Sequence, residues 1–172
     1  MKEYNGKVRV VFKNMVVHPQ VVMDAHKAGC AAAKQGKFVA FKDAFWTKAY
    51  DVYSSSHDQG KLGGDNLMAI AKDIGLDADK FKADMEGAEC KAQIEADAGE
   101  LQKFRVNGTP FFFINGKIIN GALPKEEFKK VIDERIKVAE ASGVSGADYY
   151  DKEVMAKGDK QFRSKRSRRQ TQ

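Results

Sequence analysis

Two cysteines are the residues of this chain best suited to redox chemistry, but their spacing does not match a dithiol site. Cys30 and Cys90 lie 60 positions apart, and the chain contains no Cys-x-x-Cys pair. Dithiol chemistry needs a thiolate stabilised at a helix end and a second cysteine one turn later to resolve the mixed disulfide. The three histidines form no cluster with the cysteines at metal-ligand spacing. We therefore expect no catalytic residue, no metal site and no cofactor.

Both cysteines fall on the apolar sides of predicted helices. Pro19 suits the first turn of a helix over about residues 20–33, which carries Cys30, and a longer helix over about residues 89–103 carries Cys90. A disulfide would need the two Cα atoms within about 7 Å, and two separate elements give no reason to expect that. Free cysteine is among the most buried residue types. Both thiols are predicted to be reduced, unpaired and largely buried.

The most constrained stretch is residues 104–121, where a turn and a proline precede a predicted β-hairpin. Residues 111–114 form a short apolar run and residues 117–119 are mostly β-branched, as is typical of strands. Asn115 and Gly116 between them favour a type I′ turn, because both tolerate positive φ. Pro110 lacks a backbone N–H and suits the entrance of the first strand.

The remaining pattern indicates an α/β protein in which helices cover a sheet. Residues 7–13 alternate and then become apolar, which predicts another strand. Asp65 and Asp77 are suited to cap two helices, and Pro124 to open a long one. An aromatic stripe at helical spacing predicts core packing rather than a ligand groove: Phe38, Phe41, Phe45 and Trp46.

Most of the net charge of +6 lies near the C-terminus. The rest of the chain is close to neutral, at +1, once five basic residues are set apart: Arg163, Lys165, Arg166, Arg168 and Arg169. We expect a solvated tail, with contact to nucleic acid or to an anionic membrane as the alternative. Nothing elsewhere in the chain predicts base readout, so no specific nucleic-acid partner is expected.

Length and hydropathy restrict the class of protein further. The 172 residues fit one domain of ordinary size. No apolar run approaches the roughly 20 residues needed to cross a bilayer, so no membrane span is predicted. Residues 1–7 also lack the apolar region of a signal peptide.

The pattern Val-x-Gly-Thr-Pro-x-Phe-Phe-Ile-Asn-Gly at residues 106–116 resembles the cis-proline loop and hairpin of DsbA-like thioredoxin-fold proteins. The likeness extends over about residues 7–136. It implies that the Thr109–Pro110 peptide bond is cis, that Pro110 packs against the active disulfide, and that substrate binds at Gly108, Thr109 and Pro110.

The resemblance also implies a domain organisation. A thioredoxin-like α/β domain over residues 1–142 would contain a helical insertion at about residues 40–103. A C-terminal extension with the basic tail would follow over residues 143–172.

The chain departs from the family pattern in one important respect. It lacks the N-terminal strand and the helix with the Cys-x-x-Cys motif that precede these elements in the family. Two interpretations follow: the chain is a fragment of a longer secreted oxidoreductase, or it is a redox-inactive relative. In either case we predict that the chain alone has no dithiol oxidoreductase activity.

The family resemblance implies a thiol–disulfide oxidoreductase that acts on extended polypeptides in the periplasm or another extracytoplasmic compartment. The alternative is a peptide-binding or chaperone-like module, which needs the same loop but no thiol. A second chain that completes the sheet is a further candidate partner.

Overall fold

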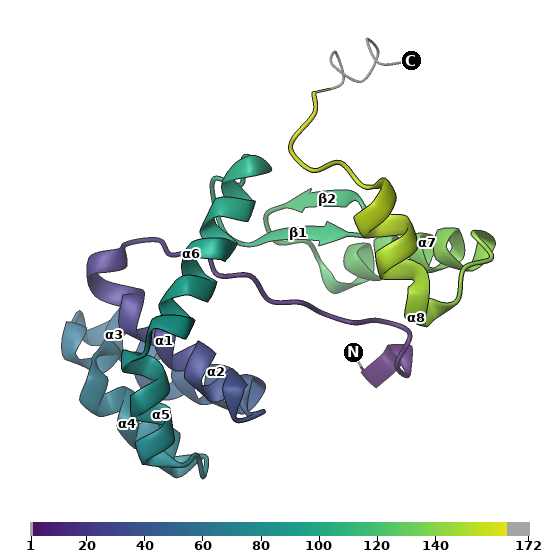
Figure 1. Cartoon of the computed structure of the whole chain (residues 1–172). Helices are drawn as coiled ribbons and strands as arrows, with labels where there is room; N and C mark the ends of the chain where they lie inside the picture. Colours follow the sequence, from purple (N-terminus) through teal and green to yellow (C-terminus); the bar gives the residue numbers. More distant parts are fainter. Residues whose placement is uncertain (1, 165–172) are drawn as a thin grey trace. The chain divides into compact units, whose positions relative to one another are not determined.

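The structure of the chain is a computed structural model that describes residues 2–164 (Figure 1). Of the predicted basic tail, Lys165, Arg166, Arg168 and Arg169 lie outside the described residues. The chain divides into two compact units. The helical unit is Lys13–Gly99, and the hairpin unit consists of Met1–Phe12 together with Glu100–Gln172. None of the helices in the described part combines the length and the apolar composition needed to span a bilayer.

The helical unit is built from helices, and of its two predicted aspartate caps only Asp77 is confirmed. The prediction for Asp65 is wrong, because this residue lies inside the first turn of the helix Gly64–Asp73, whose N-cap is Gly63. Pro19 opens the first helix, and the Asp77 carboxylate accepts a hydrogen bond from the Lys80 backbone N–H at 2.9 Å at the start of another. The elements are α1 (Pro19–Lys34), α2 (Phe38–Phe45), the π-helix η2 (Trp46–Tyr50), α3 (Asp51–Ser56), the 3-10 helix η3 (Gln59–Leu62), α4 (Gly64–Asp73), α5 (Ala78–Glu86) and α6 (Ala88–Lys103). The last turn of α6 belongs to the hairpin unit.

Small residues of α1 form one side of the core of the helical unit. Ala28, Ala31 and Ala32 are completely buried, and aromatic and aliphatic side chains of α2, α4 and α5 pack with them in one cluster. The rings of Phe41 and Phe81 have centroids 5.7 Å apart. The aromatic stripe enters this core only in part, because Phe41 is buried whereas Trp46 is 47% exposed.

The hairpin unit contains the predicted hairpin, β1 (Phe111–Ile114) and β2 (Lys117–Asn120), paired antiparallel. Asn115 and Gly116 have φ values of 43° and 85°, so the predicted turn is confirmed. Phe112 packs on Phe128 of α7, with ring centroids 4.8 Å apart. The other elements are the 3-10 helix η1 (Lys2–Tyr4), α7 (Lys125–Ala141), α8 (Gly146–Tyr149) and the π-helix η4 (Tyr150–Met155).

The predicted strand at residues 7–13 is wrong. This segment forms no ladder in the structure, and the exposed fractions of Val10 and Val11 are 68% and 60%. The sheet of the described residues consists of β1 and β2 alone. Alternating apolar residues favour an extended backbone, but a strand also needs a partner strand for its hydrogen bonds, and sequence pattern does not supply one.

Candidate functional site

The loop between α6 and β1 brings the three predicted substrate-binding residues together. The Val106 N–H donates to the Leu101 carbonyl at 3.1 Å as α6 ends, and Arg105 has a left-handed φ of 57°. Gly108, Thr109 and Pro110 then follow directly before the first strand. The Thr109–Pro110 peptide bond is cis, as expected from the resemblance.

The residues of this loop differ in their exposure and in their backbone hydrogen bonds. Thr109 and Pro110 are exposed, and Gly108 is half-buried. The Pro110 carbonyl accepts from the Gly121 N–H at 2.9 Å, which continues the β1–β2 ladder by one bond. Among the hydrogen bonds within residues 2–164, none uses the backbone N–H or carbonyl of Thr109. Thr109 is therefore an exposed residue with free backbone groups, two positions before the first residue of β1.

Aromatic side chains pack beside the loop. The ring of Phe113 lies 5.5 Å from that of Phe104 and 5.1 Å from that of Phe111, measured between centroids. From the C-terminal segment, the Phe162 N–H donates to the Lys103 carbonyl at 2.9 Å, and the Arg105 guanidinium lies 4.9 Å from the Phe162 ring centroid. These contacts hold the end of α6 and the chain that leads into the loop.

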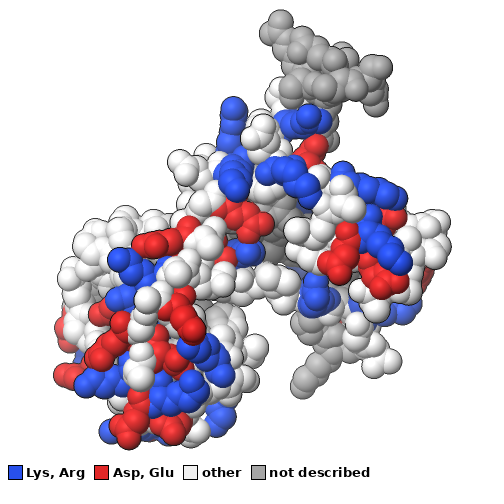
Figure 2. Space-filling view, viewed as in Figure 1, with Lys and Arg blue, Asp and Glu red and all other residues white. Residues whose placement is uncertain are grey.

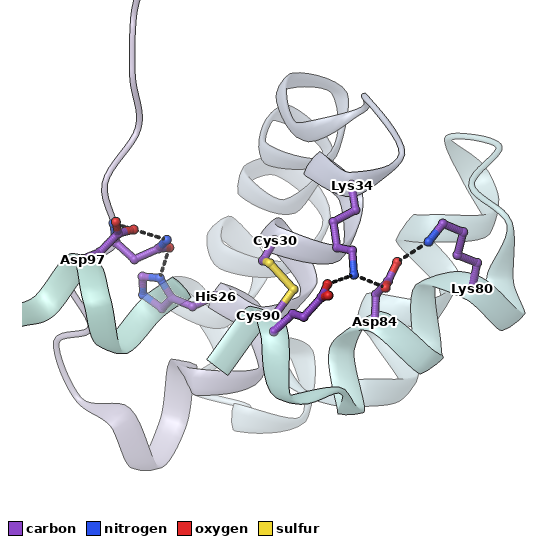
Figure 3. Close-up of a disulfide and its surroundings, with 9 residues drawn as sticks. His26, Cys30, Lys34, Lys80, Asp84, Cys90 and Asp97 are labelled. Carbon is purple, nitrogen blue, oxygen red and sulfur yellow. Dashed lines mark hydrogen bonds and ion pairs between the residues drawn. A yellow bond between two sulfur atoms is a disulfide. The ribbon is translucent and has the colours of Figure 1, made fainter. Parts of the chain in front are cut away.

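The two cysteines form a disulfide, so the prediction that they are reduced and unpaired is wrong. Cys30 of α1 and Cys90 of α6 have their Cα atoms 5.7 Å apart (Figure 3). Cys90 is completely buried and Cys30 is half-buried, so the expectation of burial is correct for Cys90. Apolar periodicity placed each cysteine on the correct helix face. It does not show which helices pack against each other, so the contact between α1 and α6 could not be predicted from it.

Charged residues surround the disulfide. Lys34, one turn after Cys30 in α1, forms ion pairs with Asp84 of α5 and with Glu89, the residue before Cys90 (Figure 3). Asp84 also pairs with Lys80 at 2.8 Å. Hydrogen bonds to Asp84 and then Glu89 raise the pKa of Lys34, and hydrogen bonds from Lys34 and then Lys80 lower the pKa of Asp84. The Lys34 ammonium and the Asp84 carboxylate therefore stay ionised at neutral pH.

A buried carboxylate, which sequence reasoning missed, lies farther along α6. Asp97 is 2% exposed and accepts hydrogen bonds from the backbone N–H and side-chain amide of Asn14, both at 2.9 Å, and from Gln93 at 3.0 Å. Lys13 forms an ion pair with it at 3.1 Å. A signal was present in the sequence, because Asp97 occurs at helical spacing in the same row as Cys90, Ile94 and Leu101.

The carboxylate of Asp97 is stabilised in its charged form. Burial is the largest single influence and raises the pKa, but the hydrogen bonds from the backbone and side chain of Asn14, together with Lys13, outweigh it and lower the pKa. His26 contacts the same network, with its Nδ1 3.0 Å from the Asn14 Oδ1. Since that oxygen can only accept, Nδ1 carries a proton. Burial lowers the pKa of His26.

The net charge of +6 is divided unevenly between the two units: the hairpin unit is basic and the helical unit is slightly acidic. The helical unit contains 11 lysines and 13 acidic residues, which gives it a net charge of −2. On the face drawn in Figure 2 the charges of both signs are interspersed. Residues 2–164 also contain no group of three histidine, cysteine or acidic side chains arranged to hold a metal ion.

Comparison with known proteins identifies the family. The sequence model of a family described as thioredoxin matches residues 1–134, more than three quarters of the chain. The chain belongs to the thioredoxin family. The predicted fold class, an α/β thioredoxin-like fold with a helical insertion, is therefore confirmed at the level of the family.

The relatives of this thioredoxin-family chain fall into two groups. The probable disulfide bond formation protein D of Bacillus cereus is 28% identical over 136 residues, which cover 77% of this chain and 60% of that protein. Its counterpart in Bacillus anthracis is also 28% identical, over 77% of this chain and 59% of that protein. The Na(+)/H(+) antiporter NhaA 3 of Salinispora tropica is 37% identical over 66% of this chain, but over only 16% of its own length.

The thioredoxin-family chain thus spans about 60% of the length of its two Bacillus relatives. No solved structure gives a significant match. The family match includes the loop, the hairpin and both cysteines, and it ends within α7. The domain limits expected from the sequence, residues 1–142 and 143–172, stay a prediction.

Proposed function

We propose that this chain provides the polypeptide-binding loop of a DsbA-like thiol–disulfide oxidoreductase. Membership of the thioredoxin family and the names of the two Bacillus relatives support the reaction class. The single observation that carries the binding role is the exposed Thr109, whose free backbone groups precede β1. An extended polypeptide would pair with these groups as an added strand, with Gly108 and Pro110 beside it.

The dithiol that exchanges with the substrate is proposed to lie outside residues 1–172. Exchange requires an accessible thiolate and a nearby resolving thiol. The two cysteines of this chain are joined to each other, and Cys90 is completely buried. On this proposal the chain binds substrate but does not turn it over alone.

An extracytoplasmic location fits the same proposal. Disulfides form and persist in oxidising compartments and are rare in the cytosol of most organisms. The Cys30–Cys90 disulfide therefore favours the periplasm or another extracytoplasmic compartment. This assignment can be checked by the oxidation state of the two cysteines in cells after thiol trapping.

Peptide binding is the direct test. The isotope-labelled chain is titrated with an unfolded peptide that lacks cysteine, and amide shifts are followed by NMR. We expect saturable shifts at Gly108, Thr109 and Phe111. Thr109→Ala keeps the backbone groups and should still bind, whereas Thr109→Pro removes the N–H and should bind at least about tenfold more weakly. Equal binding by both variants, or shifts confined to the helical unit, would contradict the proposal.

A peptide-binding or chaperone-like module without catalysis is the second candidate, because it needs the same free backbone at Thr109. The coding sequence upstream of Met1 separates the two. A Cys-x-x-Cys motif within about 35 residues, the approximate size of a strand and helix unit, would support the oxidoreductase. A stop codon in that interval, together with peptide binding by the chain, would support the non-catalytic module.

A further inference from the structure

The helix α6 is attached to the helical unit in an unusual way. The hydrophobic core of that unit is built by α1, α2, η2, η3, α4 and α5, and α6 contributes no side chain to it. The buried residues of α6 are Cys90, Ile94 and Asp97. Only Ile94 among them is a large aliphatic side chain. The apolar packing that normally holds a helix in a bundle is therefore small for α6.

The other attachments of α6 are covalent or polar. At its first turn the Cys30–Cys90 disulfide and the Lys34–Glu89 ion pair join it to α1. The Glu89 side chain is 81% exposed, and exposed ion pairs contribute little to stability. Two turns later, Asp97 joins α6 to Lys13 and Asn14 rather than to the core. The disulfide is thus the principal attachment of the start of α6.

We propose that Cys30–Cys90 is a redox-sensitive attachment, whose reduction releases the start of α6 from α1 while the core of the helical unit stays folded. Cys30 is half-buried, whereas Cys90 is completely buried, so Cys30 is the cysteine at which we expect a thiolate to attack. This inference does not depend on the proposed function, because it concerns the chain alone.

The chemistry balances with a dithiol as the reductant. A thiolate of the dithiol attacks the Cys30 Sγ, the bond to the Cys90 Sγ breaks, and Cys90 leaves as a thiolate that takes up a proton. The second thiol of the dithiol then attacks the mixed disulfide and releases Cys30. The dithiol is oxidised to a disulfide, and the two cysteines gain two electrons and two protons.

Hydrogen exchange on the folded chain tests the proposal. Amides of residues 88–95 are compared with those of α4 before and after treatment with dithiothreitol, without denaturant. We expect exchange in residues 88–95 to become about tenfold faster or more, and exchange in α4 to change less than about threefold. The double variant Cys30→Ser, Cys90→Ser should show the reduced pattern without reductant. Lys34→Gln, which removes the ion pairs to Asp84 and Glu89 but keeps the disulfide, should leave the oxidised pattern intact.

Three results would overturn the inference. The disulfide could resist dithiothreitol in the folded chain, which would make it inaccessible. Reduction could leave the exchange of residues 88–95 unchanged, which would show that Ile94 and Asp97 are sufficient to hold α6. Reduction could also accelerate hydrogen exchange in α4 as much as in residues 88–95. The disulfide would then stabilise the helical unit as a whole.

Discussion

Replacing Asp97 by asparagine should destabilise the helical unit strongly. Asparagine has the same shape, but it removes the negative charge and places an amide group among the donors of Asn14, Gln93 and Lys13. A hydrogen bond to a charged group contributes about 1.5–3 kcal/mol, and removing one partner of a buried ion pair costs about 3–5 kcal/mol. The Lys13 side chain is 40% exposed, so solvent screens the contribution of the Lys13–Asp97 ion pair to stability. We expect a loss of about 3 kcal/mol in the free energy of unfolding.

The assay is urea unfolding at neutral pH, followed by the fluorescence of Trp46, the single tryptophan of the chain. Trp46 lies in η2 and therefore reports on the helical unit. Asp24→Asn is the matched control, because Asp24 is 58% exposed and pairs with Lys27 at 3.5 Å. That control should change the free energy of unfolding by less than about 0.5 kcal/mol.

The pH dependence gives a second, independent readout. The pKa of Asp97 in the folded state is lower than the ordinary value of 3.8. Its charged form therefore stabilises the fold fully above that ordinary value, and this stabilisation is lost as the pH falls through the lowered pKa. The difference between the wild type and Asp97→Asn should shrink on acidification below pH 3.8. A loss under about 1 kcal/mol at neutral pH, or a difference that does not shrink in acid, would refute this reasoning.

Three further outcomes are expected. Phe81→Ala should cost about 3–5 kcal/mol in urea unfolding, since its side chain is completely buried. Gly116→Ala should cost about 1–2 kcal/mol by thermal unfolding, because its φ is 85°. In an insulin-reduction assay the chain should show no activity above background; activity lost on Cys90→Ser would contradict the proposed role of the disulfide.

Features set by neighbouring residues could be predicted from the sequence. Asn115 and Gly116 specify the hairpin turn by their own φ preferences, and Asp77 caps α5 through a carboxylate three residues from its donor. The cis bond between Thr109 and Pro110 agrees with the motif of contiguous residues around it, whereas the binding role of Gly108, Thr109 and Pro110 stays a prediction. In each case the residues that specify the local conformation lie within a few positions of the backbone that adopts it.

Features that depend on distant partners could not be predicted. The Cys30–Cys90 distance depends on how α1 and α6 pack, which their own periodicity does not encode. The segment with Val10 and Val11 has the composition of a strand, but pairing is a property of two segments. Asp97 lies on an apolar helix face, where a carboxylate is unusual. Its burial depends on hydrogen bonds from Asn14, which is distant in the sequence.

The small sheet has a consequence for how the chain behaves at high concentration. With only β1 and β2 paired in the described residues, the outer side of each strand presents backbone groups without a neighbouring strand. Phe113 and Ile118 on this hairpin are 44% and 45% exposed. Apolar strands with open edges are templates for further strands from other molecules. Loss of monomer in concentrated samples should therefore show a lag and be shortened by seeds, as in nucleated polymerisation.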